Sequence, residues 1–267
     1  MAKPKPETAL ATVEQTAQTA LATYDDLREA EGLGQAGIDR SKLRPPRLSL
    51  CQSGTPQRKH GNPKQIENLD EAMYFNPLSG EIYGRTVDIV IIKHLGTTYI
   101  QFKPGELGKV LDFNVPAGDP RTRGVEKMVD GKRTWIKPIA TEFVNYLVFI
   151  PKTGEIVTLS FKSTGLPAAK AIDSLLAYPL RLNGQLFMKP PTWARTFQLS
   201  SAPKSEAGND WHVPSATYTQ VTPEATRAIC RQAFDDYAKF ELTKKDYEEA
   251  ETIDAEQPNP ADDSIPF

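Results

Sequence analysis

The chain has 267 residues, of which 39% are hydrophobic and 25% are charged, and its formal net charge is -2. This length and composition allow one domain of about 200 residues with a full core, flanked by terminal extensions. The longest apolar runs are far shorter than the roughly 20 residues of a membrane-spanning helix, and residues 1–10 lack the apolar stretch of a signal peptide. We therefore expect a cytoplasmic protein without membrane association.

The net charge hides an asymmetry between the middle of the chain and its ends. Residues 1–31 hold 3 basic and 6 acidic side chains, and residues 246–267 hold 8 acidic side chains and no basic one. The residues between them, 32–245, hold 29 basic and 20 acidic side chains, a net charge of +9. A basic body with an acidic tail predicts a polyanionic partner for the body and a basic partner for the tail.

The first segment, residues 1–40, is rich in Ala, Thr, Gln and Glu, and we expect an extension that is partly helical or disordered. Within it, residues 32–37 match the letters of GxGxxG, the dinucleotide fingerprint. That fingerprint requires a strand before it and a helix after it. Because Pro45 and Pro46 follow too soon for a helix, the stretch is interpreted as a linker and no nucleotide cofactor is expected.

Residues 41–245 have the pattern of strands and turns expected of one domain. Runs rich in β-branched and aromatic residues predict strands over residues 87–94, 97–103, 143–150, 156–162, 193–199 and 216–221. Turns are predicted at residues 94–96 and 151–154, and Asp130-Gly131 predicts a hairpin within residues 125–137. Helices are predicted over residues 166–182, ended by Asn183-Gly184, and from Thr222-Pro223 to about residue 240.

This pattern predicts a mainly β protein. Many short strands with two or three helices favour a small β-barrel that resembles an oligonucleotide-binding (OB) fold with insertions. From residue 246 onward the sequence is acidic and contains Pro, so a disordered tail is expected.

The sequence contains no catalytic constellation of a known type, such as a GxSxG elbow, a P-loop or a catalytic Cys/His signature. Cys51 and Cys230 are far apart and belong to no CxxC pair, so no disulfide is expected. The three histidines, at positions 60, 94 and 212, lack the spacing of metal ligands, so neither a metal nor a cofactor is expected. We therefore expect a binding protein rather than an enzyme, with an undetected nuclease as the enzyme alternative.

Basic and aromatic residues alternate at strand spacing, which places them on the same face of a strand. Three such rows are residues 133, 135 and 137, residues 99, 101 and 103, and residues 193, 195 and 197. Aromatic rings stack on bases of any sequence with about 1 to 3 kcal/mol per base, while Lys and Arg contact phosphates. The candidate DNA-binding residues are Tyr99, Lys103, Arg121, Arg123, Lys132, Arg133, Trp135, Lys137, Lys162, Trp193 and Arg195. A core position is the alternative for each Trp, more so for Trp193, and a merely solvated loop is the alternative for the basic hairpin.

The last six residues, Asp262-Asp263-Ser264-Ile265-Pro266-Phe267, resemble the acidic tip of bacterial single-stranded DNA-binding proteins. A Phe ring can fill an apolar pocket while carboxylates pair with Arg or Lys around its rim. The resemblance implies that Asp262, Asp263, Ile265, Pro266 and Phe267 recruit replication, repair or recombination proteins, such as a polymerase, helicase or nuclease. A tail that only aids solubility is the alternative.

Three segments of the body, residues 44–48, 76–84 and 159–164, resemble phage single-stranded DNA-binding proteins. This resemblance implies a protein that coats and protects single-stranded DNA without sequence preference during phage replication and recombination. The body is much longer than that of the bacterial proteins, so their tetramer and site size do not transfer. The alternatives are a single-strand annealing recombinase and an adaptor or inhibitor that binds a host protein. The sequence does not indicate oligomeric state, or DNA rather than RNA.

Overall fold

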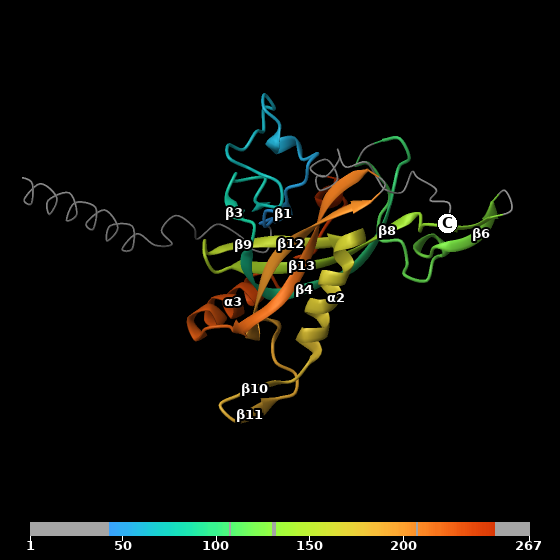
Figure 1. Ribbon diagram of the computed structural model, residues 1–267. Coiled ribbons are helices and arrows are strands. Elements are labelled where there is room, and N and C mark those ends of the chain that lie inside the picture. Colours follow the sequence, from blue (N-terminus) through green and yellow to red (C-terminus); the bar gives the residue numbers. More distant parts are fainter. Residues whose placement is uncertain (1–42, 107, 130–131, 207, 249–267) are drawn as a thin grey trace, which may run out of the picture. The chain divides into compact units, whose positions relative to one another are not determined.

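The computed structural model describes residues 43–248 apart from residues 107, 130–131 and 207 (Figure 1). Its elements are β1 (Ser49–Leu50), η2 (Pro56–Arg58), β2 (Tyr74–Phe75), β3 (Ile82–Gly84), β4 (Val87–Phe102), β5 (Val110–Asp112), η3 (Pro120–Thr122), β6 (Val125–Val129), β7 (Lys132–Ile136), β8 (Ala140–Ile150), β9 (Glu155–Lys162), η4 (Ser163–Gly165), α2 (Leu166–Ala177), β10 (Leu180–Leu182), β11 (Gln185–Phe187), η5 (Thr192–Ala194), β12 (Arg195–Glu206), β13 (Asn209–Val221) and α3 (Glu224–Asp236). The predictions for residues 1–40 lie outside the described residues. Among the described helices, none has the length and apolar composition needed to cross a membrane.

The central sheet has the strand order β13-β12-β4-β8-β9, with β5 paired to the end of β4, and every pairing is antiparallel. The predicted mainly β fold is therefore confirmed. Within the described residues no strand ladder joins β9 to β13, so this sheet is open at both edges. A short segment covers part of the β9 edge, because the Leu48 amide donates to the Thr158 carbonyl and the Thr158 amide donates to the Pro46 carbonyl, both at 2.8 Å.

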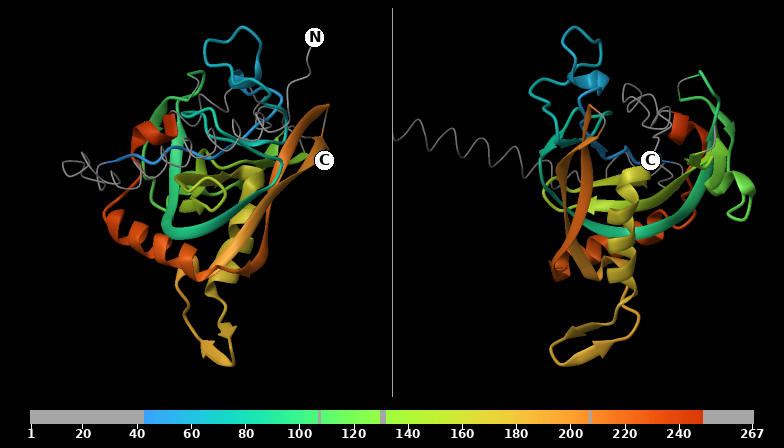
Figure 2. Two further views of the ribbon diagram at one scale, coloured as in Figure 1. Left: turned by 90° about the vertical axis from the view of Figure 1, so that its left-hand side faces the viewer. Right: turned by 45° about the vertical axis from the view of Figure 1, so that its right-hand side comes forward.

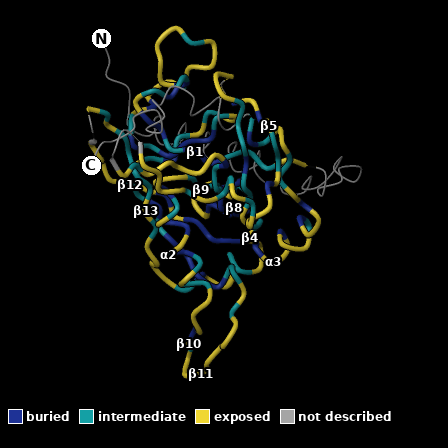
Figure 3. The backbone as a smooth tube through the Cα atoms, turned by 90° about the vertical axis from the view of Figure 1, so that its right-hand side faces the viewer, coloured by how far each residue is buried: buried dark blue, intermediate teal, exposed yellow. Residues whose placement is uncertain are grey.

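Helices cover both faces of the middle of this sheet. On one face, Ile89 and Ile91 of β4 pack with Ala169 and Ile172 of α2. On the other face, Val90 and Ile92 of β4, and Leu147 and Phe149 of β8, pack with Cys230, Ala233 and Tyr237 from α3 and the residue after it. Strands buried on both faces read as continuous apolar runs rather than as alternating ones, which is the pattern of residues 89–92 and 146–150. Figure 3 shows these strands as the buried centre of the molecule.

The predicted turn at residues 94–96 is wrong, because β4 continues through it as one strand. The β4–β8 register shifts between Ile91 and Lys93 and again between His94 and Gly96. Gly96 has a φ of 93°, a conformation that glycine adopts without steric cost, and its amide donates to Nδ1 of His94 at 2.9 Å. The extra residues are thus absorbed as bulges, which bend a strand without ending it. Figure 2 shows β4 as a long bent strand.

The first predicted helix is shorter than the sequence suggested. It ends at Ala177, because Pro179 disfavours a helical conformation for the residue before it. Asn183 and Gly184, expected to end the helix, instead form the two-residue turn between β10 and β11, with φ values of 48° and 81°. The second predicted helix is confirmed as α3, with Pro223 at its start and Glu224 in its first turn.

The body of the protein extends further toward the C-terminus than the expected boundary at residue 246. Tyr247 is buried and packs against Phe143, with ring centroids 5.1 Å apart. Its hydroxyl donates to Thr98 Oγ1 at 3.1 Å. Asp246 is also ordered by contacts, since its carboxylate accepts bonds from the amide and hydroxyl of Thr243. Glu248 also contacts the body, because its carboxylate accepts a hydrogen bond from the Val110 amide at 3.2 Å. The rest of the acidic tail, residues 249–267, lies outside the described residues.

Candidate nucleic-acid interface

Most of the predicted DNA-binding residues come together at one end of the central sheet, which we call the distal end. It comprises the β6–β7 hairpin, the end of β4 with the first residue after it (residues 99–103), β5 with η3, the start of β8 and the end of β9. The ladders fix this grouping, because Tyr99 pairs with Glu142 and Lys162 pairs with Phe143. β8 begins four residues after β7 ends, which attaches the hairpin to the same end. Figure 1 shows β6 projecting away from the central sheet beyond the label of β8.

The pairing of β6 with β7 confirms the hairpin predicted within residues 125–137, whereas its predicted turn residues, 130–131, lie outside the described residues. Its register pairs Val129 with Lys132 across residues 130–131, and Glu126 with Trp135. Directly paired residues share a face, so one face carries Met128 and Arg133 beside Glu126 and Trp135. Lys137 lies one residue beyond the end of β7. Of the predicted row, only Arg133 and Trp135 therefore belong to the strand. Lys132 is part of β7 next to the turn.

Trp135 is the most exposed large aromatic ring of this end, with 57% of its surface accessible. Its indole lies directly against Gly124, where a Cβ atom would overlap the six-membered ring and the Nε1 edge. One side of the ring is therefore backed by the chain while much of the rest stays accessible. Arg133, on the same face, is also exposed. A supported aromatic ring beside a cation can stack on a base and contact its phosphate. Gly124 was missed in the sequence, where a lone Gly before a strand signals only a break.

Arg121 belongs to this end but is tied into the protein. Its guanidinium donates to Gln101 Oε1 and Asp112 Oδ2 at 2.8 Å, and to both carboxylate oxygens of Asp119 at 2.9 and 3.0 Å. These hydrogen bonds hold the pKa of Asp119 down to about 2. The side chain thus fastens the η3 loop to β4 and β5, and its charge is largely matched by two carboxylates. Arg123, two residues on, is exposed.

The remaining distal residues have weaker geometry for binding DNA. Tyr99 is partly buried, and burial, followed by the facing Glu142 carboxylate, raises its pKa. Lys103 lies 3.7 Å from Glu106 in an exposed ion pair. Lys162 is the last residue of β9, at the distal end. Its ammonium lies 6.0 Å from the centre of the Phe143 ring.

The expected exposed row of residues 193, 195 and 197 is not formed, which corrects that part of the prediction. Trp193 lies in η5 and packs against Phe234 of α3, with ring centroids 5.1 Å apart. Arg195 is only 4% exposed, and its Nη2 donates to the carbonyls of Tyr178 and Pro179 at 2.7 and 3.1 Å. Phe197 is fully buried in the core. These three residues lie where the central sheet is covered on both faces, so their side chains do not form an exposed row.

Arg195 has a structural role that the sequence did not reveal. The two carbonyls it binds follow directly on the last residue of α2, where unsatisfied carbonyls and the helix dipole favour a cation. Burial lowers the pKa of Arg195, yet the guanidinium remains a cation because its normal value is so high. Arg195 therefore closes the end of α2 and fixes the start of the β10–β11 hairpin.

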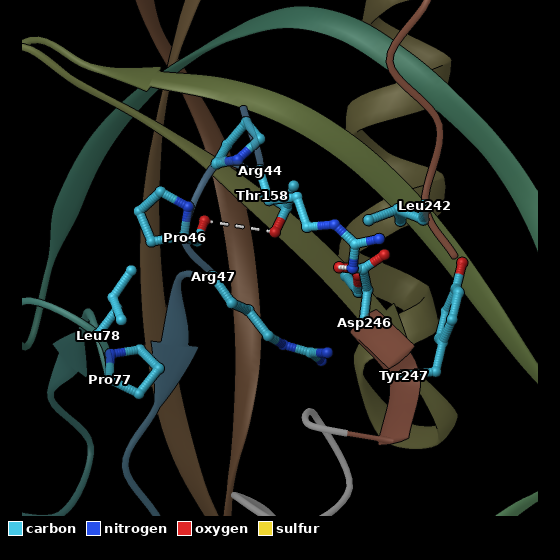
Figure 4. A pocket seen from close by; sticks show the side chains of 11 residues that line it. Arg44, Pro46, Arg47, Pro77, Leu78, Thr158, Leu242, Asp246 and Tyr247 are labelled. Atoms are coloured by element: carbon cyan, nitrogen blue, oxygen red, sulfur yellow. Dashed lines mark hydrogen bonds and ion pairs between the residues drawn. The ribbon is translucent and has the colours of Figure 1, made fainter. Parts of the chain in front are cut away.

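A small pocket lies beside β9, where Thr158 and Ser160 contribute to its lining (Figure 4). It is enclosed by residues 44–47, the Pro77-Leu78 turn and residues 242–247, and its volume is about 170 Å³. Arg44 pairs with Asp246 at 3.3 Å across it, and the Thr158 hydroxyl donates to the Pro46 carbonyl at 3.4 Å. Sites for organic ligands usually occupy about 300 to 1,000 Å³. This pocket is smaller than that range. The grouped aromatic and basic residues make the distal end the candidate interface.

The two cysteines and the possible metal ligands are the other chemical groups of interest in the body. Both cysteines are buried as free thiols, and burial raises the pKa of Cys51 to about 11 and that of Cys230 to about 12. In the part of the chain that the structure describes, no group of three or more His, Cys, Asp or Glu side chains is placed to hold a metal ion. The predicted partner-binding residues Asp262, Asp263, Ile265, Pro266 and Phe267 lie outside the described residues.

Comparison with known proteins gives one match. The family described as Pam3 phage gp34-like protein matches residues 14–253. No curated protein matches the chain, and no solved structure matches it.

Proposed function

This chain belongs to the Pam3 phage gp34-like protein family, and from this premise we propose that it binds single-stranded DNA without sequence preference. In this proposal it coats and protects the strand during phage DNA replication or recombination, in the cytoplasm of the bacterial host. The protein acts by binding and carries out no chemical step. Its acidic C-terminal segment recruits replication, repair or recombination proteins.

The observation that carries the proposal is the face of the β6–β7 hairpin. Trp135 is mostly exposed although Trp is a residue that proteins usually bury, and its ring is backed by Gly124 rather than left unsupported. Arg133 and Glu126 share this face, Arg123 is exposed just before the hairpin, and Lys127 is exposed on the opposite face. This combination provides a stacking surface with cations around it, which suits a strand whose bases are unpaired.

The geometry also supports single-stranded over double-stranded DNA. Bases in a duplex are stacked on one another, so an aromatic ring reaches their faces only after unstacking them. The projecting hairpin of five-residue strands offers one exposed ring and a few cations. A two-stranded ribbon can also enter the major groove, so it is the exposed ring, rather than the shape of the hairpin, that favours unpaired bases. Specific readout of base edges is not required by such a surface, so the proposed binding is independent of sequence.

The test is a titration of the full chain with single-stranded DNA, duplex DNA and RNA of equal length, at several salt concentrations. We expect single-stranded DNA to bind more tightly than duplex. The logarithm of the binding constant should fall with the logarithm of salt concentration by about 0.7 per phosphate contact. Equal affinity for duplex at every salt concentration would contradict the proposal. Capture of a host protein that persists after nuclease treatment, without DNA binding, would favour the adaptor alternative.

A further inference from the structure

A second projecting hairpin, β10–β11, carries unusually exposed apolar side chains. Tyr178 and Met188 are each 63% exposed, Leu186 is 49% exposed and Phe187 is 38% exposed. Figures 1 and 2 show this hairpin standing away from the central sheet, and Figure 3 colours most of it as exposed. Apolar side chains grouped on a projecting element mark a contact surface more often than isolated ones do.

The hairpin is held firmly at its base although its strands have only three residues. Arg195 binds the carbonyls of Tyr178 and Pro179 on one side. On the other side, the Thr192 hydroxyl donates to the Ile92 carbonyl of β4 at 2.6 Å. Two-stranded hairpins of this length are marginal by themselves, so these anchors preserve its shape. Its exposed side chains are therefore presented by a fixed element rather than by a loose loop.

The charge of this region indicates what kind of partner it fits. No Asp or Glu occurs between residues 174 and 205, whereas Arg181 and Lys189 are both exposed on or beside the hairpin. Arg181 shares one face of the hairpin with Leu186, whereas Phe187 pairs with Leu180 on the other face. Two aromatic rings and two cations without an acid are the chemistry that binds single-stranded nucleic acid.

We propose that the β10–β11 hairpin is a second contact for the same DNA strand that the β6–β7 hairpin binds. Tyr178 and Phe187 stack on bases, Lys189 beside Phe187 contacts phosphates, and Arg181 adds positive charge from the other face of the hairpin. This inference rests on the proposed function, because it names a second part of the same binding surface.

The strand connectivity places the two hairpins at opposite ends of β4. Thr196, just after β10–β11, pairs with Val90, whereas Ala140, just after β6–β7, pairs with Gln101. A β-strand rises about 3.3 Å per residue, so the eleven-residue separation corresponds to at most about 36 Å along β4. Only a strand long enough to cover this distance can contact both hairpins. Short oligonucleotides must therefore bind through one hairpin alone.

The test compares oligothymidylates of about 6 nucleotides, which is near the lower end of the usual site size of about 4 to 16, and of about 30 nucleotides, which is well above it. The variant Tyr178→Ala/Phe187→Ala in the full chain should weaken binding of the long oligonucleotide roughly tenfold. Binding of the short oligonucleotide at the β6–β7 hairpin should change less than about twofold. Leu78→Ala, which removes an equally exposed apolar side chain from another loop, serves as the matched control. Photo-cross-linking of the long probe with 5-iododeoxyuridine should label Tyr178.

The outcomes separate this inference from the function it rests on. If wild-type protein binds neither oligonucleotide, the proposed function fails. If it binds both, and the double variant binds the long one as tightly as wild type without cross-linking at residue 178, only the second contact is overturned. A double variant that changes self-association in sedimentation, with unchanged DNA affinity, would show instead that the hairpin binds a second copy of the chain.

Discussion

The two projecting hairpins have the same local design and differ in how the body holds them. Each consists of two short antiparallel strands, of five residues in β6–β7 and of three residues in β10–β11. The β6–β7 hairpin has Trp135 resting on Gly124, a contact made within the hairpin and the residue before it. The β10–β11 hairpin depends on Arg195, a buried side chain from the next strand. A substitution of Trp135 therefore removes a surface side chain from the β6–β7 hairpin, whereas a substitution of Arg195 removes a buried side chain that holds the β10–β11 hairpin in place.

The largest effect should come from Arg195→Ala. This change removes two hydrogen bonds from a cation and leaves two carbonyls at the end of α2 without a partner. Each bond to a charged group contributes about 1.5 to 3 kcal/mol, so we expect a loss of roughly 3 kcal/mol in the free energy of unfolding. Denaturant unfolding measures it. Arg181→Ala, an exposed cation in the same hairpin, should be nearly neutral, and equal losses for both variants would contradict the anchoring role.

Trp135→Ala should weaken single-stranded DNA binding by about 1 to 3 kcal/mol while the salt dependence stays almost unchanged, because stacking is lost and phosphate contacts remain. Fluorescence anisotropy at several salt concentrations measures both quantities. Arg133→Ala should instead reduce the slope by about 0.7. Trp135→Phe should keep part of the affinity. A Trp135→Ala variant that loses thermal stability but not DNA affinity would place this residue in the core and remove the contrast between the hairpins.

Gly124→Ala should act on the same ring without deleting it. The added methyl group overlaps the position of the Trp135 indole, so the ring must move away from its support. We expect a loss of about 1 kcal/mol in DNA affinity, at the low end of a stacking contribution. Gly118→Ala, at a position where a Cβ has open space, is the matched control. Normal affinity for the Gly124 variant would show that the backing of the ring is unimportant for binding.

Removal of residues 249–267 should tighten DNA binding a fewfold at low salt. Six carboxylates on a segment attached to a basic body compete with DNA for the same cations, and screening weakens that competition as salt rises. The truncation begins after Tyr247, so the core stays intact. Anisotropy titrations at low and high salt measure the difference. A gain that is independent of salt concentration would argue against electrostatic competition.

The smallest effect concerns pH and the distal end. Arg121 holds the pKa of Asp119 at about 2, below its usual 3.8, so this carboxylate stabilises the fold at pH values above 3.8. That stabilisation disappears as the pH falls from 3.8 toward 2, because the carboxyl then becomes protonated in the folded state as well. The melting temperature of wild type should therefore approach that of Asp119→Asn over this interval. A constant difference between the two proteins down to pH 2 would contradict the assignment.

The sequence predicted local features well and long-range ones poorly. Runs of β-branched residues located β8 and β9, and Asp130-Gly131 located the β6–β7 hairpin, because both signals depend on neighbouring residues. The bend at Gly96 could not be distinguished from a turn, since a φ of 93° serves either purpose. Burial of Arg195 was not predictable either, because its partners lie 16 and 17 residues away in sequence. In the sequence its alternation with Trp193 and Phe197 resembles an exposed row, because the sequence does not reveal that helices cover both faces of the central sheet.

The burial of Tyr247 has a consequence for how the protein folds as it is made. Its hydroxyl bonds to Thr98, 149 residues earlier in the sequence, and its ring fills the cluster around Ile100 and Phe143. Contacts of such high sequence separation slow folding, because the intervening chain must be ordered before they form. A ribosome delivers about 5 to 20 residues per second, so this cluster stays incomplete for several seconds after β4 has emerged. During that interval Ile100 and Phe143 lack the ring that covers them in the folded protein.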